Sequence, residues 1–472
     1  MKNYFRDMDT HMLSFDTIRP VDHDLVDLAF NKKKADDRKE WLRQFVPGTY
    51  LDHRIRNIPI SDFINKELIL FSMADNIRSI PSVVDGLKPG QRKVLFGCFK
   101  RNLKTEIKVQ QLQGYVSEHT AYHHGDQSLV MTIVGLAQDY CGSNNVNLLL
   151  PNGQFGTRSM GGKDAASARY IFTAVPRITR LMFHPKDDDL LNYLDDDGQS
   201  IEPEWYVPVV PHVLLNGAEG IGTGWSTFVP NYNPRDVVEN LRRRMAGEEY
   251  VPMTPWYRGF VGTIEHSAAD RFRVSGNATQ LDERTWEITE LPVRVWTTSY
   301  KEWLEERVVG SDKTPSTLRE YKEYHTDTTV HFVVELNSRG EEEIARVGPE
   351  AFFKLSTVIS TGNMVLFNPE GKIKKYASPL EILDDFYFLR LGFYQRRKEH
   401  LVDQLKLVYD RLSNQARFVS MIISKELSVS NRKKADIMDE LRQLNFQAFP
   451  KVEAKAKSVA DAANEEHDEL DE

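Results

Sequence analysis

The sequence predicts an α+β protein of several domains, and three observations support that prediction. Its 472 residues, 40% hydrophobic and 28% charged, suffice for roughly three domains with cores of their own. Helical spacing before residue 250 gives way to short alternating segments between 250 and 370. After Ser378 a long, heptad-like helical pattern begins. We therefore expect a helical module, an α/β domain and a coiled-coil segment, in that order.

Composition excludes several classes of protein. The longest apolar runs, "LILF" and "VPVV", are too short to cross a bilayer, so no membrane partner is expected. The N-terminus mixes acids and bases without an apolar stretch, unlike a signal peptide. Cys98 and Cys141 are the only cysteines, which fits a reducing compartment and neither a disulfide framework nor a zinc site.

The net charge of −8 hides a local basic run. Between Asn76 and Lys108, eight lysines and arginines oppose only Asp85 and Glu106, whereas the last fourteen residues carry seven acids and no base. Because the footprint of a polyanion is local, whole-chain charge is the wrong statistic. The run is either a solvated helix face or a docking surface. Its cations are Arg78, Lys88, Arg92, Lys93, Lys100, Arg101, Lys104 and Lys108.

The first half of the chain predicts a series of helices. A charged helix ends at Pro47-Gly48, and a second begins near Ile60 with Ser61 as its N-cap. "GLKPGQRKVLFGCFKRN" opens a basic helix, and "HHGDQSLVMTIVGLAQDY" opens another with Asp126 in its first turn. Three short helices followed by Gly-rich, β-like segments suit a winged-helix module, although the same spacing fits other helical domains.

Between residues 250 and 370 the pattern predicts strands. "FVGTIEHS", "RFRVSG", "TWEITEL" and "TVHFVVEL" are short alternating or β-branched runs separated by turns. We expect an α/β accessory domain here.

A long helix is predicted from Ser378 to about Leu427. Ser378 is the expected N-cap, Pro379 the first helical residue and Glu381 the third, and no further proline occurs before Pro450. At 1.5 Å per residue the helix would be about 70 Å long, and its apolar seam requires a partner helix. After Pro450 the composition predicts disorder. The seam consists of Leu401, Leu405, Val408, Leu412, Ala416, Val419 and Ile423.

Two segments, "HTAYHHGDQSL" and "LPNGQFGTRSMGGKDAASARY", gather groups suited to chemistry on a phosphate. Cations can stabilise a phosphorane-like transition state, and a phenol can attack phosphorus to leave a covalent phosphotyrosine. The small residues would let a nucleic-acid backbone approach. Taken singly, each residue has an ordinary interpretation, since most tyrosines only pack. The candidates are His123, His124, Arg158, Lys163, Arg169 and Tyr170.

A glycine-rich segment, "NGAEGIGTGWST", surrounds Ile221. It matches neither a dinucleotide-binding fingerprint nor a P-loop, so a nucleotide site is rejected. Ile221 is instead either an apolar wedge between base steps or an isoleucine buried in a tight turn.

A calcium loop is a further candidate. Asp195, Asp197, Gly198 and Glu204 fall at positions 3, 5, 6 and 12 of an EF-hand pattern. Tyr193 would occupy position 1, where a carboxylate is required, so the site is rejected. No metal ligands are predicted in this chain.

Taken together, the motifs resemble the breakage–reunion region of eukaryotic type IIA DNA topoisomerases. The matching segments, in order, are "YLDHR", "PISDFINKELILFSMADNIRSIPSVVDGLKPGQRKVLFG", "AYHHGDQSL", "LPNGQFGTR", "GGKDAASARY", "EPEWY" and "NGAEGIGTGWST". The similarity extends to about residue 447. His119, where cysteine is expected, and Asp126, where glutamate is usual, are small departures.

The resemblance implies roles for individual residues. In this family the tyrosine of the "ARY" motif attacks a DNA phosphodiester and becomes linked to a 5′ phosphate, so Tyr170 is the expected nucleophile. Arg169 and His124 would stabilise the transition state, and Ile221 would be the wedge. The expected DNA contacts are Arg78, Lys88, Arg92, Lys93, His123, Arg158 and Lys163.

The resemblance also implies an architecture of winged helix, tower and antiparallel coiled coil. Residues 1–50 would be the end of a TOPRIM region, 51–248 the winged-helix cleavage domain and 249–375 the tower. Residues 376–447 would form the coiled-coil segment and 448–472 a disordered acidic tail.

Parts of the family pattern lie outside this chain. The E-G-D-S-A and D-x-D signatures of the metal-binding TOPRIM region are absent, and we expect the Mg²⁺ ligands, the ATP site and the exit gate on segments beyond it. We expect a nuclear homodimer that acts on double-stranded DNA through ATP-driven passage of one duplex through a break in another. The alternatives are a DNA-binding or DNA-bending fragment without catalysis, and a structural coiled-coil protein.

Overall fold

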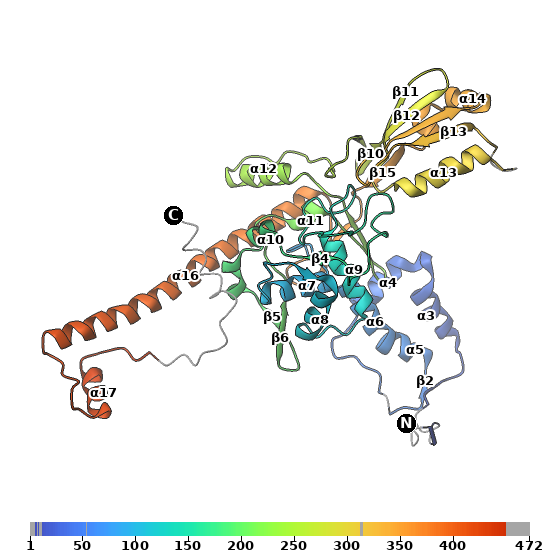
Figure 1. Ribbon diagram of the computed structural model, residues 1–472. Helices are drawn as coiled ribbons and strands as arrows, with labels where there is room; N and C mark the ends of the chain where they lie inside the picture. The colour runs from blue at the N-terminus through green and yellow to red at the C-terminus, as the bar shows by residue number, and fades with distance from the viewer. Residues whose placement is uncertain (1–4, 7, 9–11, 53, 312–314, 450–472) are drawn as a thin grey trace. The chain divides into compact units, whose positions relative to one another are not determined.

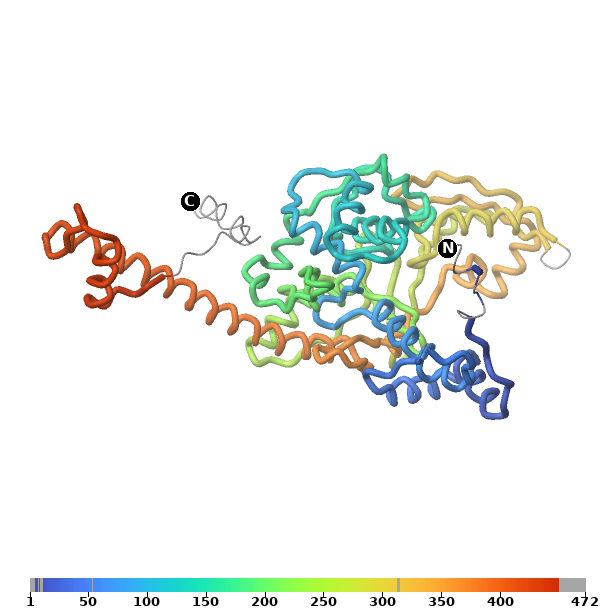
Figure 2. Tube along the Cα trace, turned by 90° about the horizontal axis from the view of Figure 1, so that it is seen from below, coloured from blue at the N-terminus to red at the C-terminus, as the bar shows by residue number. Residues whose placement is uncertain are grey.

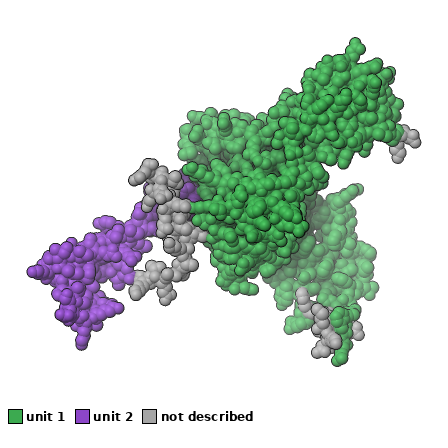
Figure 3. All heavy atoms as spheres, viewed as in Figure 1, with its two compact units in different colours: residues 1–182, 192–387 green, residues 183–191, 388–472 purple. Residues whose placement is uncertain are grey.

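The computed structural model describes residues 5, 6, 8, 12–52, 54–311 and 315–449. It divides into two compact units, shown in green and purple in Figure 3. Unit 1 comprises residues 1–182 and 192–387, and unit 2 comprises residues 183–191 and 388–472. The tail predicted to be disordered lies, from residue 450 onward, outside the described residues. None of the helices in the described ranges combines the length and hydropathy that a bilayer span requires.

Unit 1 begins with a small helical layer, drawn in blue in Figure 1. The predicted charged helix is confirmed as α4, which ends at Arg43, before Pro47-Gly48. Trp41 and Leu42 of α4 are buried against Ile64 and Ile69, so this layer has an apolar core of its own. Its elements are β1 (Ser14–Phe15), α3 (Pro20–Phe30), η1 (Lys32–Lys34), α4 (Ala35–Arg43) and β2 (Asn57–Ile58).

The helix predicted from Ile60 is confirmed, but its predicted cap is wrong. The helix starts after Pro59, so Ser61 lies inside the first turn. The Ser61 amide donates instead to the Asp22 carboxylate at 3.2 Å, and Arg19 donates to the Ser61 hydroxyl at 2.7 Å. A carboxylate from another helix therefore serves the free amide, which local spacing does not reveal. The helix continues as α5 (Ile60–Phe63), a π turn η2 (Ile64–Leu68) and α6 (Ile69–Ser79).

Three helices form the centre of unit 1: α7 (Pro89–Lys100), α8 (Val109–His119) and α9 (Asp126–Ala137). The predictions of α7 and α9 are confirmed, with Asp126 in the first turn of α9. The sequence pattern does not reveal α8, because its polar "QQLQG" start hides a narrow apolar face. A Cβ on Gly97 would lie 2.7 Å from the Val116 side chain, so α7 and α8 meet at a contact only glycine permits.

Short strand pairs and helices follow the helical centre. The rejected calcium loop is a tight β hairpin, since β5 and β6 pair across Asp197 and Gly198, both with positive φ. The other pairs are β3 (Ile107–Lys108) with β4 (Phe172–Thr173), and β7 (Ala218–Ile221) with β8 (Ser226–Val229). The remaining elements are β5 (Tyr193–Asp196), β6 (Gln199–Pro203), α10 (Arg177–Met182), α11 (His212–Asn216) and α12 (Pro234–Met245).

The predicted α/β domain is built on two antiparallel sheets, with strand orders β15-β10-β9 and β11-β12-β14-β13. All four predicted strands are confirmed, as β9, β10, β12 and β14. Helix α13 packs Tyr300 and Leu304 against Phe332 of the larger sheet. The strands are β9 (Thr263–Ala268), β10 (Arg271–Ser275), β11 (Asn277–Gln280), β12 (Thr285–Glu290), β13 (Leu318–Glu323), β14 (Phe332–Leu336) and β15 (Ser356–Ser360). The helices are α13 (Thr297–Val309), α14 (Ser338–Val347) and α15 (Pro349–Phe352).

A hairpin, β16 (Met364–Phe367) with β17 (Ile373–Tyr376), leads into the long helix α16 (Pro379–Ile423). The predicted cap is confirmed. The Ser378 hydroxyl accepts from the Glu381 amide at 3.2 Å, and the Glu381 carboxylate accepts from the Ala377 amide at 2.8 Å. α16 ends four residues before the predicted end at Leu427.

Unit 2 contains η3 (Pro185–Leu190), most of α16 and α17 (Lys434–Gln443). Beyond α16 the chain turns back, and Arg417 donates to the Leu444 carbonyl at 2.7 Å (Figure 2). Leu405, Leu412 and Ile423 of the predicted seam are 67, 57 and 76% exposed. The antiparallel partner along this seam remains a prediction.

Candidate active site

Tyr170 lies on a segment held from both sides by helix α8. The amides of Val109 and Gln110, in the first turn of α8, donate to the carbonyls of Ile171 and Ala168 at 3.0 and 3.2 Å. Side chains alternate along the extended segment, so Ile171 is 1% exposed and Tyr170 is 67% exposed. The backbone is therefore fixed while the phenol projects into solvent.

Arg169 stands beside the phenol. Its guanidinium carbon lies 5.1 Å from the centre of the Tyr170 ring, a cation–π geometry. Both side chains are exposed. A positive charge and a nucleophilic oxygen are thus offered together at one surface point.

The two adjacent histidines precede helix α9. His124 packs its ring edge against Tyr122, with centroids 5.4 Å apart, and His123 lies 3.5 Å from the Asp196 carboxylate. Both histidines are exposed.

Helix α8 connects this histidine turn to the tyrosine segment. The Gln113 side chain donates to the Asp126 carboxylate at 3.0 Å, two residues beyond His124. Gln113 lies about one helical turn beyond Gln110, the residue whose amide holds the tyrosine segment. Both candidate catalytic segments are therefore anchored to the same short stretch of α8.

The glycines before Tyr170 do not make room for a nucleic acid, and that prediction is wrong. A Cβ on Gly161 would lie 2.4 Å from the Trp296 ring, and one on Gly162 would lie 2.3 Å from the Gln138 side chain. A Cβ on Gly156 would lie 2.5 Å from Gly162 itself. All three glycines have positive φ. They allow the protein to pack closely on itself.

Arg158 is buried rather than presented to solvent. Its guanidinium donates to the Glu290 carboxylate and, at 3.2 Å, to the Leu291 carbonyl. The two charged side chains are 5% and 1% exposed. Lys163, in contrast, is exposed on the same loop.

Arg92 is also buried, in an ion pair with Asp85. It donates through Nε at 2.7 Å and through Nη2 at 3.0 Å to the two carboxylate oxygens. Burial alone would lower the pKa of Arg92, but the charge and hydrogen bonds of Asp85 outweigh it, so the pKa is raised. Asp85 also accepts from the amides of Leu87 and Tyr206. The pair connects distant parts of unit 1.

The basic run thus divides into buried and exposed members. Lys93 is largely buried and donates to Glu202 at 2.9 Å, and burial lowers the pKa of half-buried Lys88, against the opposing effect of Glu219. Arg78 is exposed and donates to Asp75 at 2.7 Å. The cations of the run on the surface are Arg78, Lys100, Arg101, Lys104 and Lys108.

Ile221 lies at the tip of the β7–β8 hairpin and is 84% exposed. The alternative, a turn that buries the isoleucine, is therefore wrong. The hairpin is held against α6, because Asn76 donates to the Thr223 carbonyl at 3.0 Å. A Cβ on Gly220 would lie only 1.9 Å from the Ser79 carbonyl oxygen. The glycines thus bring the hairpin onto the helix.

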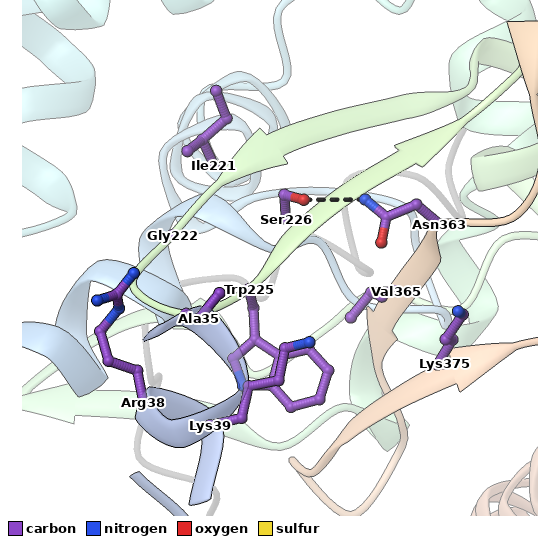
Figure 4. A pocket seen from close by; sticks show the side chains of 11 residues that line it. Ala35, Arg38, Lys39, Ile221, Gly222, Trp225, Ser226, Asn363, Val365 and Lys375 are labelled. Atoms are coloured by element: carbon purple, nitrogen blue, oxygen red, sulfur yellow. Dashed lines mark hydrogen bonds between the residues drawn. The ribbon is translucent and has the colours of Figure 1, made fainter. Parts of the chain in front are cut away.

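Trp225 anchors the other face of this hairpin. Figure 4 shows Ile221 pointing away from the pocket, while Trp225 points toward Lys39. The Lys39 ammonium lies 4.8 Å from the centre of the Trp225 ring. A pocket of about 330 Å³ lies here, and Lys375 lines its opposite side. The hairpin tip therefore has a fixed base and an exposed apolar point.

Within the described ranges, no group of three or more His, Cys, Asp or Glu side chains could hold a metal ion. These described residues therefore supply no Mg²⁺ site. Both cysteines are free, and burial raises the pKa of Cys98 to about 12 and of Cys141 to about 11.

Sequence reasoning missed several residues that shape the site. Gln113 and Glu290 carry no motif of their own, and each is revealed only by its distant partner. Trp225 stands inside a recognised segment, and an aromatic residue four positions after an exposed isoleucine in a glycine-rich hairpin is a usable signal for an anchor.

The chain matches a family model described as the A-type subunit of DNA gyrase/topoisomerase IV, over residues 78–470. A second model, the C-terminal associated domain of TOPRIM, matches residues 1–76.

Several curated proteins are similar over nearly the whole chain. It is 54% identical over 472 residues to DNA topoisomerase 2 of Candida albicans, covering 99% of this chain and 32% of that protein. It is 53% identical over 451 residues to DNA topoisomerase 2 of Saccharomyces cerevisiae, covering 96% of this chain and 32% of that protein. The chain therefore spans about a third of the length of these relatives.

A solved structure shares the fold. It is a crystal structure of the Plasmodium falciparum topoisomerase II DNA-binding, cleavage and re-ligation domain, 44% identical with a TM-score of 0.81. The match covers 94% of this chain and 61% of that one.

Proposed function

Because this chain belongs to the DNA gyrase/topoisomerase IV family, we propose that it forms the DNA-cleavage and re-ligation core of a type II DNA topoisomerase of the eukaryotic kind. The observation that supports this most directly is the exposed Tyr170 phenol on a backbone fixed by α8, with the Arg169 guanidinium over its ring. The proposed substrate is double-stranded DNA.

In the proposed reaction Tyr170 is the nucleophile. Its oxygen loses a proton and attacks a backbone phosphorus, forming a bond to the 5′ phosphate, while the bond from phosphorus to the 3′ oxygen breaks. The 3′ oxygen takes up a proton and leaves as a hydroxyl. Attack of that hydroxyl on the phosphotyrosine reverses both changes and reseals the strand. The energy of the cut bond is kept in the tyrosyl ester, so resealing needs no other energy source.

Nearby cations would stabilise the charge that develops on phosphorus. We assign this role to Arg169 and His124 and assign backbone contacts to Arg78, Lys88, His123 and Lys163. Arg92, Lys93 and Arg158 are buried or largely buried in ion pairs. We therefore assign them to holding the scaffold rather than to contacting DNA.

For the whole protein we propose ATP-driven passage of one duplex through a double-strand break in another. One tyrosine cuts one strand, so a double-strand break requires two copies, and a homodimer follows. We place the Mg²⁺ ligands and the ATP site in the part of the relatives that this chain does not span. Mg²⁺ there would polarise the scissile phosphate. The eukaryotic relatives support a nuclear location.

The proposal is tested by trapping the covalent intermediate. The chain is joined to the remaining segments of the Candida albicans relative and incubated with end-labelled duplex and Mg²⁺, and the reaction is stopped with detergent. We expect a tryptic peptide containing Tyr170 to carry the 5′ end of the cut strand. An adduct on another residue, or none, would contradict the proposal.

Duplex affinity should fall steeply with salt. Each neutralised phosphate contributes a log–log slope of roughly −0.9, so about six surface cations predict a slope near about −5. Fluorescence anisotropy of a labelled duplex, titrated with this chain at several salt concentrations, measures it. Lys163→Gln should reduce the slope by about one, whereas Lys374→Gln, which removes a lysine paired with Asp385, should not. A flat salt response would exclude this docking surface.

Replacing Ile221 by alanine should reduce DNA bending more than it reduces affinity. An apolar wedge offsets an unstacking cost of about a few kcal/mol per step by allowing more contact with bent DNA. Energy transfer between dyes at the two ends of a short duplex reports the bend. Val261→Ala, at another side chain that is 67% exposed, is the matched control. Equal bending by the Ile221→Ala protein and the unaltered chain would exclude the wedge.

The exposed Ile221 also supports a second candidate function, a DNA-bending module without catalysis. That function predicts bending by the whole protein with no covalent adduct under any metal condition. The trapping experiment separates the two candidates.

A further inference from the structure

The loop that precedes Tyr170 is joined to the root of the α/β domain through buried contacts. Residues 158–161 of the loop meet residues 290–298, where β12 ends and α13 begins. The Thr298 amide donates to the Ser159 carbonyl at 3.0 Å. Gly161 lies directly against the Trp296 ring, which is why a Cβ there would have no room.

Glu290 is the centre of this junction. One carboxylate oxygen accepts from Arg158 and from the Leu291 amide at 2.8 Å, and the other accepts from the Val261 amide at 3.1 Å. Arg158 adds a bond to the Leu291 carbonyl. Both charges are almost fully buried, where ions persist only with such complete pairing. The geometry of the two side chains is therefore tightly determined.

The loop passes this constraint on to the tyrosine segment. Asp164 accepts from the Thr157 amide and hydroxyl at 2.9 and 2.6 Å, and the Ala166 amide donates to the Gln154 carbonyl at 2.9 Å. These bonds close the loop on itself between Arg158 and Tyr170. The nucleophile is therefore held at two places, by α8 on one side and by Glu290 through Arg158 on the other.

We propose that Glu290 is a positioning residue, through which the α/β domain orients the nucleophile loop for DNA cleavage. The inference rests on the proposed function for its catalytic consequence, whereas its structural part can be tested without DNA. It assigns Arg158 to the same role, in place of a direct contact with DNA.

The first test uses hydrogen exchange on this chain alone. Glu290→Gln keeps the size of the side chain but removes the charge that pairs with Arg158. We expect amide exchange in the peptide spanning residues 153–170 to speed up several-fold, with exchange in α16 unchanged. Glu343→Gln, which breaks the more exposed Arg307–Glu343 pair of the same domain, should leave that peptide unchanged. Equal exchange in the Glu290→Gln and unaltered proteins would overturn the inference.

The second test measures adduct formation in the joined protein used above. Misplacement of a reacting group by about 1 Å can cost about 100-fold in rate, so Glu290→Gln should slow adduct formation at saturating DNA by about tenfold or more. Duplex affinity should not change, because Glu290 does not face the DNA. Normal adduct formation in Glu290→Gln would overturn the positioning role while leaving the proposed function intact, since the unaltered protein still forms its adduct.

A double variant separates positioning from loss of folding. Arg158→Met combined with Glu290→Gln removes both charges, so no unpaired ion is left buried and folding should be recovered. A positioning role predicts that the adduct still forms slowly although the melting temperature is restored. Recovery of the full rate along with stability would show that the pair acts only on folding. Weaker duplex binding by this variant, but not by Glu290→Gln alone, would return Arg158 to a DNA contact.

Discussion

Tyr170→Phe is expected to abolish the covalent adduct while leaving duplex affinity and stability unchanged. The substitution removes only the attacking oxygen. The Tyr170 ring is 67% exposed and its backbone is held by bonds from α8 to Ala168 and Ile171, so the fold does not depend on the phenol. Denaturing gels of end-labelled duplex, after detergent trapping in the joined protein, measure the adduct, and anisotropy measures binding.

Two comparisons make this result specific. Tyr122→Phe removes a phenol from the histidine turn and should leave the adduct in place. Arg169→Lys keeps a positive charge but loses the planar fork that can hold two phosphate oxygens, so cleavage should slow without disappearing. A persistent 5′ adduct in the Tyr170→Phe protein would show that another residue is the nucleophile.

Arg92→Met is expected to cause the largest loss of stability among these variants, about 3–5 kcal/mol. The substitution leaves the Asp85 carboxylate, which is fully buried, without its charged partner. Asp85 would keep only its bonds from the amides of Leu87 and Tyr206. Urea unfolding followed by tryptophan fluorescence measures the difference.

An exposed pair provides the control for this prediction. Arg273 pairs with Glu265 on the surface strands β9 and β10, where solvent screens the charges. Arg273→Met should therefore shift the unfolding midpoint little. If Arg92→Met also shifted it little, Arg92 would not be the structural residue that its burial indicates, and a DNA contact would again be the better assignment.

Local signals in the sequence were sufficient for most of the predicted elements. The alternating runs became β9, β10, β12 and β14, and the Ser378–Glu381 signature became the cap of α16. These features succeed because periodicity and capping depend on residues within a few positions of each other. Helix α8 escaped because its buried face is defined by partners, Val116 against Gly97 for example, rather than by a strong pattern of its own.

The sequence by itself determined the family, the expected nucleophile and its neighbour, since Tyr170 and Arg169 lie in one continuous motif. Only the tertiary structure decided which cations are available to a ligand. Arg78 and Lys163 are exposed, whereas Arg92 and Arg158 are buried against Asp85 and Glu290.

The physical reason is the separation of the partners along the chain. Arg158 and Glu290 lie 132 positions apart, and no local rule connects a charge to a carboxylate at that distance. The same holds for the glycines before Tyr170, whose missing side chains make room for Trp296 and Gln138. Residue type determines which interactions a side chain can make. The packing of distant segments determines whether its partner is solvent, a ligand or another part of the protein.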